Sequence, residues 1–193
     1  AVEVTGAAGQ APVGLPEATT TLGPQELHRS AGLFLQDEIN LTPGIYMQRR
    51  SMSGGQTIRI RGYSNGGDAG NFVGTGYKAY LNGIPITDAE GQTVLDDIDF
   101  ANLGRVDVIR GPASSLYGAG IGGVVNFYSA RPEQAGSAIT QGLIGGADGL
   151  FRSDTRLSRV TDASSLALAY GHQGYQSYRI HSASKKDFGS LLG

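Results

Sequence analysis

Short hydrophobic stretches separated by glycine-rich segments run through the middle of the chain. In residues 57–61 (TIRIR), isoleucines alternate strictly with arginines, which predicts a half-buried strand. Residues 77–81 and 84–87 flank Asn82-Gly83, a dipeptide typical of a hairpin turn, and Pro85 marks the second stretch as an edge strand. Further strands are expected at 45–48, 106–110 and 124–128.

Two short helices are expected between these strands. Within residues 31–41 the apolar side chains fall on one helical face, and Pro43-Gly44 ends the pattern. Residues 96–103 begin with aspartates, which are favourable at the positive end of a helix dipole. Together these elements predict an α+β domain over residues 27–131, a small mixed β-sheet with short helices.

The sequence pattern changes after Pro132. Three longer stretches, at 137–144, 151–160 and 165–185, alternate polar and apolar residues without a helical period. In the second stretch one face carries Arg152, Asp154, Arg156 and Ser158, and the other carries Phe151, Ser153, Thr155 and Leu157. An antiparallel meander with one hydrated face is typical of a water-filled β-barrel. Because three strands cannot close a barrel, residues 132–193 are interpreted as its first three strands, in a chain that looks truncated.

The first 26 residues have a different character. They contain Pro12, Pro16 and Pro24 and no lysine or arginine, which predicts an extended arm over residues 1–26. The arm lacks a basic region followed by an apolar segment, so any secretory signal is expected to have been removed or never to have been present.

Composition narrows the classes of function. Glycine supplies 31 of the 193 residues, more than twice the usual share of about 7%, while 39% hydrophobic residues suffice for a core. The formal charge of −2 lacks the cationic excess that a phosphate backbone attracts, so no nucleic-acid partner is expected. The absence of cysteine excludes disulfides and thiolate metal sites. No apolar run approaches the roughly 18 residues of a spanning helix, which leaves β-barrel strands possible.

Two glycine motifs match known functional patterns only in part. Residues 62–66 (GYSNG) match the nucleophile elbow of serine hydrolases, but a glycine-rich loop follows Ser64 where the elbow needs a helix. Residues 118–123 (GAGIGG) match the dinucleotide fingerprint, yet here the strand follows the glycines instead of preceding them. Tight turns and close backbone approach explain these glycines better.

Candidate catalytic and metal-binding side chains are dispersed along the chain. His28, His172 and His181 have no motif around them, and the aspartates within residues 96–99 are explained more simply by a helix start. No metal or other cofactor is expected. The lack of a catalytic constellation favours binding or transport over an enzyme, with a serine hydrolase built on Ser64 kept as a rival.

Five stretches, in this order and spacing, resemble the plug domain of TonB-dependent outer-membrane receptors. They are residues 41–45 (LTPGI), 58–62 (IRIRG), 80–85 (YLNGIP), 104–118 (GRVDVIRGPASSLYG) and 122–126 (GGVVN). The resemblance covers about residues 27–131, and the long fourth stretch is far more specific than either glycine motif. Residues 132–193 look like the first three strands of the barrel of about 22 strands that surrounds such a plug.

The resemblance implies a function in transport. Receptors of this family take up scarce, bulky ligands across the outer membrane of Gram-negative bacteria: siderophores, cobalamin, haem, glycans or peptides. The plug blocks the barrel lumen, and a periplasmic arm is passed to a TonB-type energy transducer of the inner membrane. The implied partners are therefore this transducer, an external ligand and outer-membrane lipid. A soluble periplasmic binding or signalling module with a plug-like fold is the alternative.

The resemblance also implies roles for two arginines at strand ends. Arg61 and Arg110 occupy the arginine positions of the family's I-R-G and R-G-P motifs, and are implied to pair with barrel carboxylates beyond residue 193. A planar guanidinium suits such bidentate pairing. Gly62 and Gly111 would permit the turn after each arginine.

Ligand contacts and a transducer-binding segment are implied in the same way. Loops 49–56, 63–76 and 87–92 are expected to face the ligand, because loops supply adaptable polar groups. Their candidate contacts are Arg49, Arg50, Gln56, Tyr63, Asn65, Asn71, Asp88 and Gln92. Val2, Glu3, Val4, Thr5 and Gly6 are similar to the Ton box, which adds as a strand to the transducer.

Overall fold

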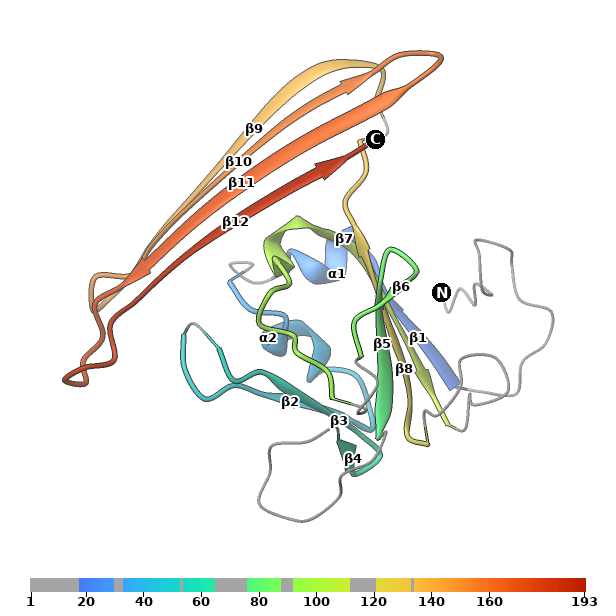
Figure 1. The fold of residues 1–193 in the computed structure, drawn as a ribbon, viewed down its shortest axis with the longest axis vertical. Coiled ribbons are helices and arrows are strands. Elements are labelled where there is room, and N and C mark those ends of the chain that lie inside the picture. Colours follow the sequence, from blue (N-terminus) through green and yellow to red (C-terminus); the bar gives the residue numbers. More distant parts are fainter. Residues whose placement is uncertain are drawn as a thin grey trace.

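The computed structural model describes residues 18–29, 33–52, 54–64, 76–87, 92–111, 121–132 and 134–193. It shows an α+β part, formed by the residues up to 132, and a long four-stranded antiparallel sheet beside it (Figure 1). Both the α+β class and the change to antiparallel strands after Pro132 confirm the expectation from the sequence.

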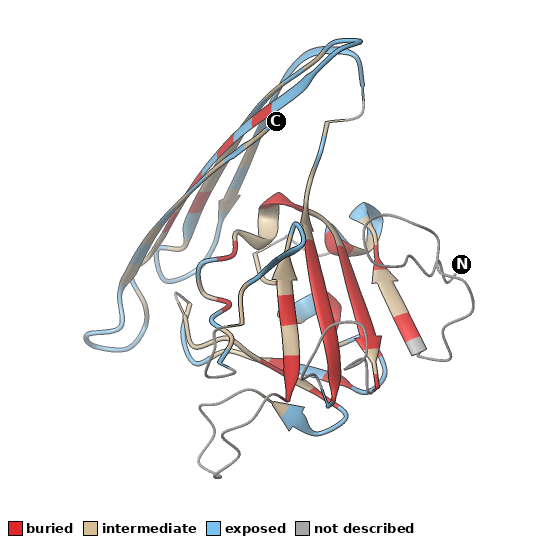
Figure 2. Ribbon diagram, turned by 45° about the vertical axis from the view of Figure 1, so that its right-hand side comes forward, coloured by how far each residue is buried: buried red, intermediate tan, exposed pale blue. Residues whose placement is uncertain are grey.

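A five-stranded sheet of mixed direction forms the centre of the α+β part. Its order is β1 (Ala18–Leu22), β7 (Leu103–Arg110), β8 (Gly123–Ser129), β5 (Tyr77–Leu81) and β6 (Ile84–Pro85). Strands β5 and β8 pair in parallel, and the other neighbours are antiparallel. The central strands β7 and β8 are buried along most of their length, and their buried residues include the polar Asp107 and Asn126. Val106, Val108, Val125 and Phe127 are fully buried (Figure 2).

A smaller sheet contributes to the same core. Its strands are β2 (Ile45–Gln48), β3 (Thr57–Ile60) and the short β4 (Tyr63–Ser64), in that order. Ile58 and Ile60 are buried, while Arg59 between them is only partly covered. The strict alternation in residues 57–61 therefore predicts the buried face correctly.

The helices are shorter than the sequence predicts. The helix expected at 31–41 is reduced, among the described residues, to α2 (Gln36–Ile39). It ends there because the Asn40 amide bonds to both the N–H and the carbonyl of Met47, which ties the chain to β2. The helix expected at 96–103 is only the 3-10 turn η2 (Phe100–Asn102), because Asp99 accepts from the Ala101 N–H and Leu103 already pairs in β7.

The arm predicted over residues 1–26 is too long. Residues 18–22 form β1, which pairs antiparallel with β7, and α1 (Pro24–Leu27) follows. Three successive threonines in β1 favour strand structure, and the Thr21 hydroxyl donates to Asp107 over 2.8 Å. The remainder of the predicted arm, residues 1–17, lies outside the described residues.

The sequence after residue 132 forms four strands, not three. They are β9 (Gly136–Gly145), β10 (Phe151–Val160), β11 (Ser165–Tyr175) and β12 (Ser184–Leu192), in the order β12-β11-β10-β9. The stretch predicted as one strand at 165–185 is interrupted by a turn in which Ser177 and His181 take positive φ angles of 70° and 62°. Residues 176–183 contain no glycine or proline, so the sequence pattern does not mark this turn.

The four-stranded sheet has two chemically distinct faces. Arg152, Asp154 and Arg156 lie on the face toward the α+β part, as their alternation predicts. The opposite face exposes a row of cross-strand neighbours, Ile139, Leu157, Leu168 and Leu191. In the part of the chain that the structure describes, no helix is long and apolar enough to cross a membrane.

Candidate functional site

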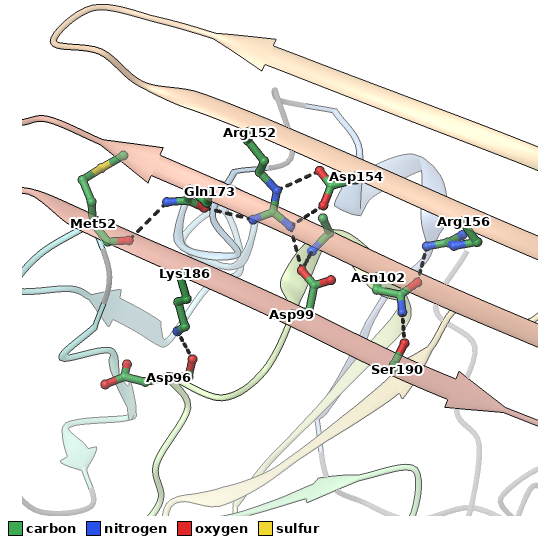
Figure 3. A network of polar contacts seen from close by, with 11 residues as sticks. Met52, Asp96, Asp99, Asn102, Arg152, Asp154, Arg156, Gln173, Lys186 and Ser190 are labelled. Carbon is green, nitrogen blue, oxygen red and sulfur yellow. Dashed lines mark hydrogen bonds and ion pairs between the residues drawn. The ribbon is translucent and has the colours of Figure 1, made fainter.

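The segment that leads into β7 docks onto the inner face of the four-stranded sheet (Figure 3). Three of its polar residues, Asp96, Asp99 and Asn102, follow one another at intervals of three and each reaches a strand of that sheet. This contact joins segments far apart in the sequence and is the strongest polar constellation among the described residues. It is the candidate functional site.

Arg152 of β10 lies at the centre of this contact. Its guanidinium bonds in bidentate fashion to Asp154, through Nε at 2.8 Å and Nη2 at 2.9 Å, and donates from Nη1 to Gln173 of β11 at 3.1 Å. Nη2 also donates to Asp99 across the interface at 2.7 Å. The arginine side chain is only 3% exposed. Gly171 provides the space, since a Cβ there would lie 2.7 Å from an Asp154 carboxylate oxygen.

Two further contacts flank the arginine. Asn102 accepts from Nη2 of Arg156 and donates to the Ser190 hydroxyl of β12 at 2.6 Å. The main-chain carbonyl of Asp96 accepts from the Lys186 ammonium of β12. The described inner face therefore presents three cations, Arg152, Arg156 and Lys186, and one anion, Asp154, to the docked segment.

The same segment also fixes the loop between β2 and β3. The Asp96 carboxylate accepts from the N–H groups of Gly55 and Gln56, at 2.9 and 3.1 Å. The side chain of Gln173 donates to the carbonyl of Met52 at 3.4 Å. Loop 49–56, predicted to face the ligand, is thus linked to the four-stranded sheet both directly and through Asp96.

A cavity of about 350 Å³ lies next to these contacts. Its lining mixes polar and apolar groups and includes His28, Asp99, Asn102, Thr140, Arg156 and Tyr170. The charged groups suit water or a hydrophilic ligand. A cavity of this character between the α+β part and the strands provides space in which the docked segment can shift.

The two arginines singled out in the sequence converge at Gly44. Both side chains pass 3.9 Å from the point where a Cβ on Gly44 would lie. Arg110 donates to the Pro43 carbonyl at 2.6 Å and to the Thr20 hydroxyl at 2.8 Å, so it fastens β1 and the turn before β2 to the end of β7. Arg61 is exposed, and its own φ of 52° continues into the positive φ of Gly62. Their pairing with barrel carboxylates stays a prediction.

The predicted ligand contacts fall into three groups. Arg49 stacks on Phe34, with its guanidinium carbon 3.2 Å from the ring centroid, and burial lowers the pKa of Arg49 although Asp37 acts in the opposite direction. Arg49 is therefore a packing residue of the loop. Arg50, Tyr63 and Gln92 are exposed, and Gln56 is partly covered. Asn65, Asn71, Asp88 and the segment Val2, Glu3, Val4, Thr5 and Gly6 lie outside the described residues.

The glycines of 118–123 that the structure describes confirm close backbone approach. A Cβ on Gly123 would lie 2.1 Å from the Ile109 carbonyl oxygen, and one on Gly122 would lie 2.7 Å from that of Gly76. Ser64 lies in β4, and His172 pairs with Asp187 at 2.7 Å on the outward face of the four-stranded sheet. Among the residues that the structure describes, no group of three metal-ligating side chains gathers.

Comparison with known families settles the kinship of the chain. The TonB-dependent Receptor Plug Domain family matches residues 12–125, more than half of the sequence. The chain belongs to this family. The match begins before β1, in agreement with the inclusion of β1 and α1 in the plug.

Relatives of known function are receptors and transporters. This chain is 37% identical over 100 residues to the ferrioxamine receptor of Yersinia enterocolitica, covering 49% of this chain and 12% of that protein. The vitamin B12 transporter BtuB of Vibrio vulnificus (strain CMCP6) is 28% identical over 170 residues, 84% of this chain and 26% of the transporter. This chain therefore spans about a quarter or less of these relatives.

Solved structures show the same fold in both parts of the chain. The pyoverdine outer membrane receptor FpvA from Pseudomonas aeruginosa PAO1 aligns with a TM-score of 0.68 at 21% identity, over 90% of this chain and 24% of that one. Because the alignment covers most of the chain, it includes strands after the plug.

The residues that join the plug to the strands were missed in the sequence. Arg152, Asp154 and Arg156 were visible as charges on one strand face, but nothing in the pattern names their partners. Asp99 was interpreted as part of a helix start, and it does cap η2 while also pairing with Arg152. The sequence indicates only the local role of Asp99, at the start of a helix, and not its pairing with a distant arginine.

Proposed function

We propose that this chain is the plug and first strands of an outer-membrane receptor that takes up a scarce, bulky ligand with energy from the inner membrane. The plug blocks the lumen of the barrel until it is displaced, and no chemical turnover is involved. The observation that carries the proposal is the plug's docking by Asp99 and Asn102 onto the polar face of strands whose opposite face is a row of apolar side chains. A sheet with this arrangement suits a barrel with a plug inside and lipid outside.

The exposed apolar row argues against the soluble periplasmic module. Ile139, Leu143 and Leu191 are each at least two-thirds exposed on the face away from the plug. Ile139, Leu157, Leu168 and Leu191 form an apolar row across all four strands, which a soluble protein rarely exposes and membrane lipid would cover.

The relatives, together with the site, support a proposal for the ligand class. Relatives of this chain are a ferrioxamine receptor, a vitamin B12 transporter and a pyoverdine receptor. A metal-bearing chelate of this kind is therefore the proposed cargo. Loop 49–56 and exposed Tyr63 are the proposed contacts on the plug, with Arg50, Asn65, Asn71, Asp88 and Gln92 around them.

The arrangement of the plug supports a separation between ligand and transducer. In Figure 1 the β2–β3 loop points to the same side as the loops between β9 and β10 and between β11 and β12, while β1 lies at the opposite side. The ligand loops would then face outward, and the chain before β1 would start on the opposite, periplasmic side. Val2–Gly6 is the proposed Ton box, since strand addition requires only an extended segment with free backbone groups.

Arg61 and Arg110 are proposed to fasten the plug to the barrel on a second side. The Cγ of Arg61 and the Cδ of Arg110 both lie near Gly44, which brings the stems of the two side chains to the same turn of the plug. Carboxylates from barrel strands after residue 193 would complete this contact, because a paired guanidinium and carboxylate form bidentate bonds in a confined lumen.

A segment exchange in the full-length receptor tests the function. Residues 2–6 are replaced by a Gly-Ser sequence of equal length, and residues 7–11 are replaced likewise as the control. Cells are given a ferric hydroxamate chelate or cobalamin, and surface binding is measured separately from energised uptake. We expect the 2–6 exchange to abolish uptake and to spare binding, and the 7–11 exchange to spare both. Full uptake after the 2–6 exchange would contradict the Ton box assignment, and no binding of either probe would contradict the ligand class.

A further inference from the structure

Only one of the four hydrogen bonds of the Arg152 guanidinium crosses from the strands to the plug. Two go to Asp154 on the same strand and one to Gln173 on the neighbouring strand, and Asp99 supplies the fourth. The strands therefore hold this arginine in position whether or not the plug is docked. Its charge is already compensated before Asp99 arrives.

Asp99 is also bonded within its own segment. The same carboxylate oxygen that accepts from Arg152 accepts from the Ala101 N–H at 3.3 Å. When plug and strands separate, Asp99 keeps Ala101 and Arg152 keeps Asp154. Each charged group therefore retains a partner after separation. A charged group left without a partner would raise the free energy of separation.

The charges on the inner face decide how strongly Asp99 is attracted. The described inner face carries Arg152, Arg156 and Lys186 against the single anion Asp154. Removing Asp154 would raise the positive surplus beside Asp99. It would also remove a like charge that bonds to the same Nη2 as Asp99. In a partly buried site these Coulomb effects exceed those between exposed groups.

From these contacts we infer that Asp154 is a positioning residue that weakens the docking of the plug and so keeps it releasable. It holds the guanidinium of Arg152 for Asp99 and at the same time offsets the attraction. This inference rests on the proposed function, because only a plug that must leave the strands needs a limited affinity for them. The two carboxylates on Arg152 therefore have opposite effects on plug release.

The test measures plug release in the full-length receptor in detergent micelles. Cysteines introduced at Gln25 in α1 and Ala163 in the β10–β11 turn carry a donor and an acceptor dye, and any cysteine of the receptor outside this chain, which itself has none, is first replaced by serine. Energy transfer between the dyes reports the ratio of released to docked plug at a fixed urea concentration. Both positions are exposed and neither takes part in the docking contacts.

The variants have opposite expected signs. Asp99→Asn should raise the ratio of released to docked plug about tenfold, as expected for loss of a charge-assisted hydrogen bond. Asp154→Asn should lower the ratio several-fold, and Asp154→Glu should return it toward the unsubstituted receptor. Asp148→Asn, the same change of charge in the β9–β10 loop, is the matched control and should leave the ratio unchanged.

A double variant separates this role from simple support of the fold. In the Asp99→Asn background, Asp154→Asn should no longer favour docking, because the carboxylate whose attraction it modulates is gone. Gly171→Ala gives a second variant, since its methyl group would displace the Asp154 carboxylate without changing a charge. It should shift the ratio in the same direction as Asp154→Asn.

Several outcomes would overturn the inference. An increase in release for Asp154→Asn would show that Asp154 only strengthens docking. An equal effect of Asp154→Asn with and without Asp99 would show that it does not act through this contact. Energy transfer that never changes would also reject it, because the plug would not separate as a body. The proposed transport function is tested independently by the segment exchange and survives each of these results.

Discussion

The five-stranded plug sheet and the four-stranded sheet owe their stability to different interactions. In the five-stranded plug sheet, the middle strands β7 and β8 are buried on both faces, and Val106, Val108, Val125 and Phe127 are inaccessible (Figure 2). The four-stranded sheet has no comparable apolar core: one face exposes leucine and isoleucine, and the other bears charged groups. The plug thus buries its own apolar surface, whereas the strands depend on what surrounds them.

This difference explains how the two sheets can be joined and still separate. Apolar burial within the plug provides stability that does not depend on the strands. The described polar contacts between plug and strands are instead hydrogen bonds and an ion pair at Asp99, Asn102 and the carbonyls of Asp96 and Met52. Breaking such an interface exchanges protein contacts for water and leaves the plug core intact.

Truncation of a core side chain should show the contrast most strongly. Phe127 is fully buried and lies 6.2 Å from the Phe100 ring, centroid to centroid. Phe127→Ala should lower the free energy of unfolding of the plug by about 3–5 kcal/mol, because it leaves a cavity. Urea unfolding followed by circular dichroism measures the change. The control, Leu143→Ala, alters a side chain that is 68% exposed on the strands and should leave plug unfolding unchanged. Equal effects of the two changes would contradict the contrast.

A methyl group added where the backbones of β7 and β8 meet should lower the free energy of unfolding of the plug by less than Phe127→Ala does. Gly123 has a φ of 148°, and a Cβ there would meet the Ile109 carbonyl oxygen. Gly123→Ala should destabilise the plug by about 1–3 kcal/mol through overpacking. Gly189→Ala in β12 meets nothing within 4 Å and serves as the control. The measurement is the thermal unfolding midpoint of both variants. A Gly123→Ala plug as stable as the unsubstituted one would show that β7 and β8 can move apart freely.

Alkaline pH should produce the smallest change in the free energy of unfolding of the plug, through the single group Tyr77. Burial raises the pKa of Tyr77 from its ordinary value of 10.0, more than hydrogen bonds with the Ile58 main chain and Thr93 lower it. The folded plug therefore favours the neutral phenol, and the stability from this group is complete below pH 10 and is lost as pH rises above it. The free energy of unfolding, measured in urea between pH 8 and 11, should fall above pH 10. Tyr77→Phe should remove the part of the slope due to this group, and an unchanged slope would contradict the assignment.

Local patterns in the sequence were sufficient for the strands of the plug core. The alternation in residues 57–61 and the apolar runs at 106–110 and 124–128 correspond to β3, β7 and β8 within a few residues. They succeed because side-chain periodicity depends only on neighbouring residues. The predicted helices at 31–41 and 96–103 are too long, since Asn40 bonds to Met47 of β2 and Leu103 already pairs in β7.

The strand count after Pro132 shows the limit of periodicity. Polar alternation continues through the turn at 176–183, so β11 and β12 were read as one strand. The turn is formed by Ser177 and His181 in left-handed conformations and by a hydrogen bond between the Ser177 and Ser182 hydroxyls. Such a turn has no glycine or proline to mark it in the sequence.

By itself the sequence determined the family, the buried strands of the plug and the two-faced character of the later strands, because motifs and alternation are properties of adjacent residues. Only the tertiary structure decided which charges meet. Asp99 and Arg152 are 53 positions apart, and they meet because the segment that leads into β7 docks onto β10. The sequence contains both charges, but the distance between them is set by the fold of everything in between.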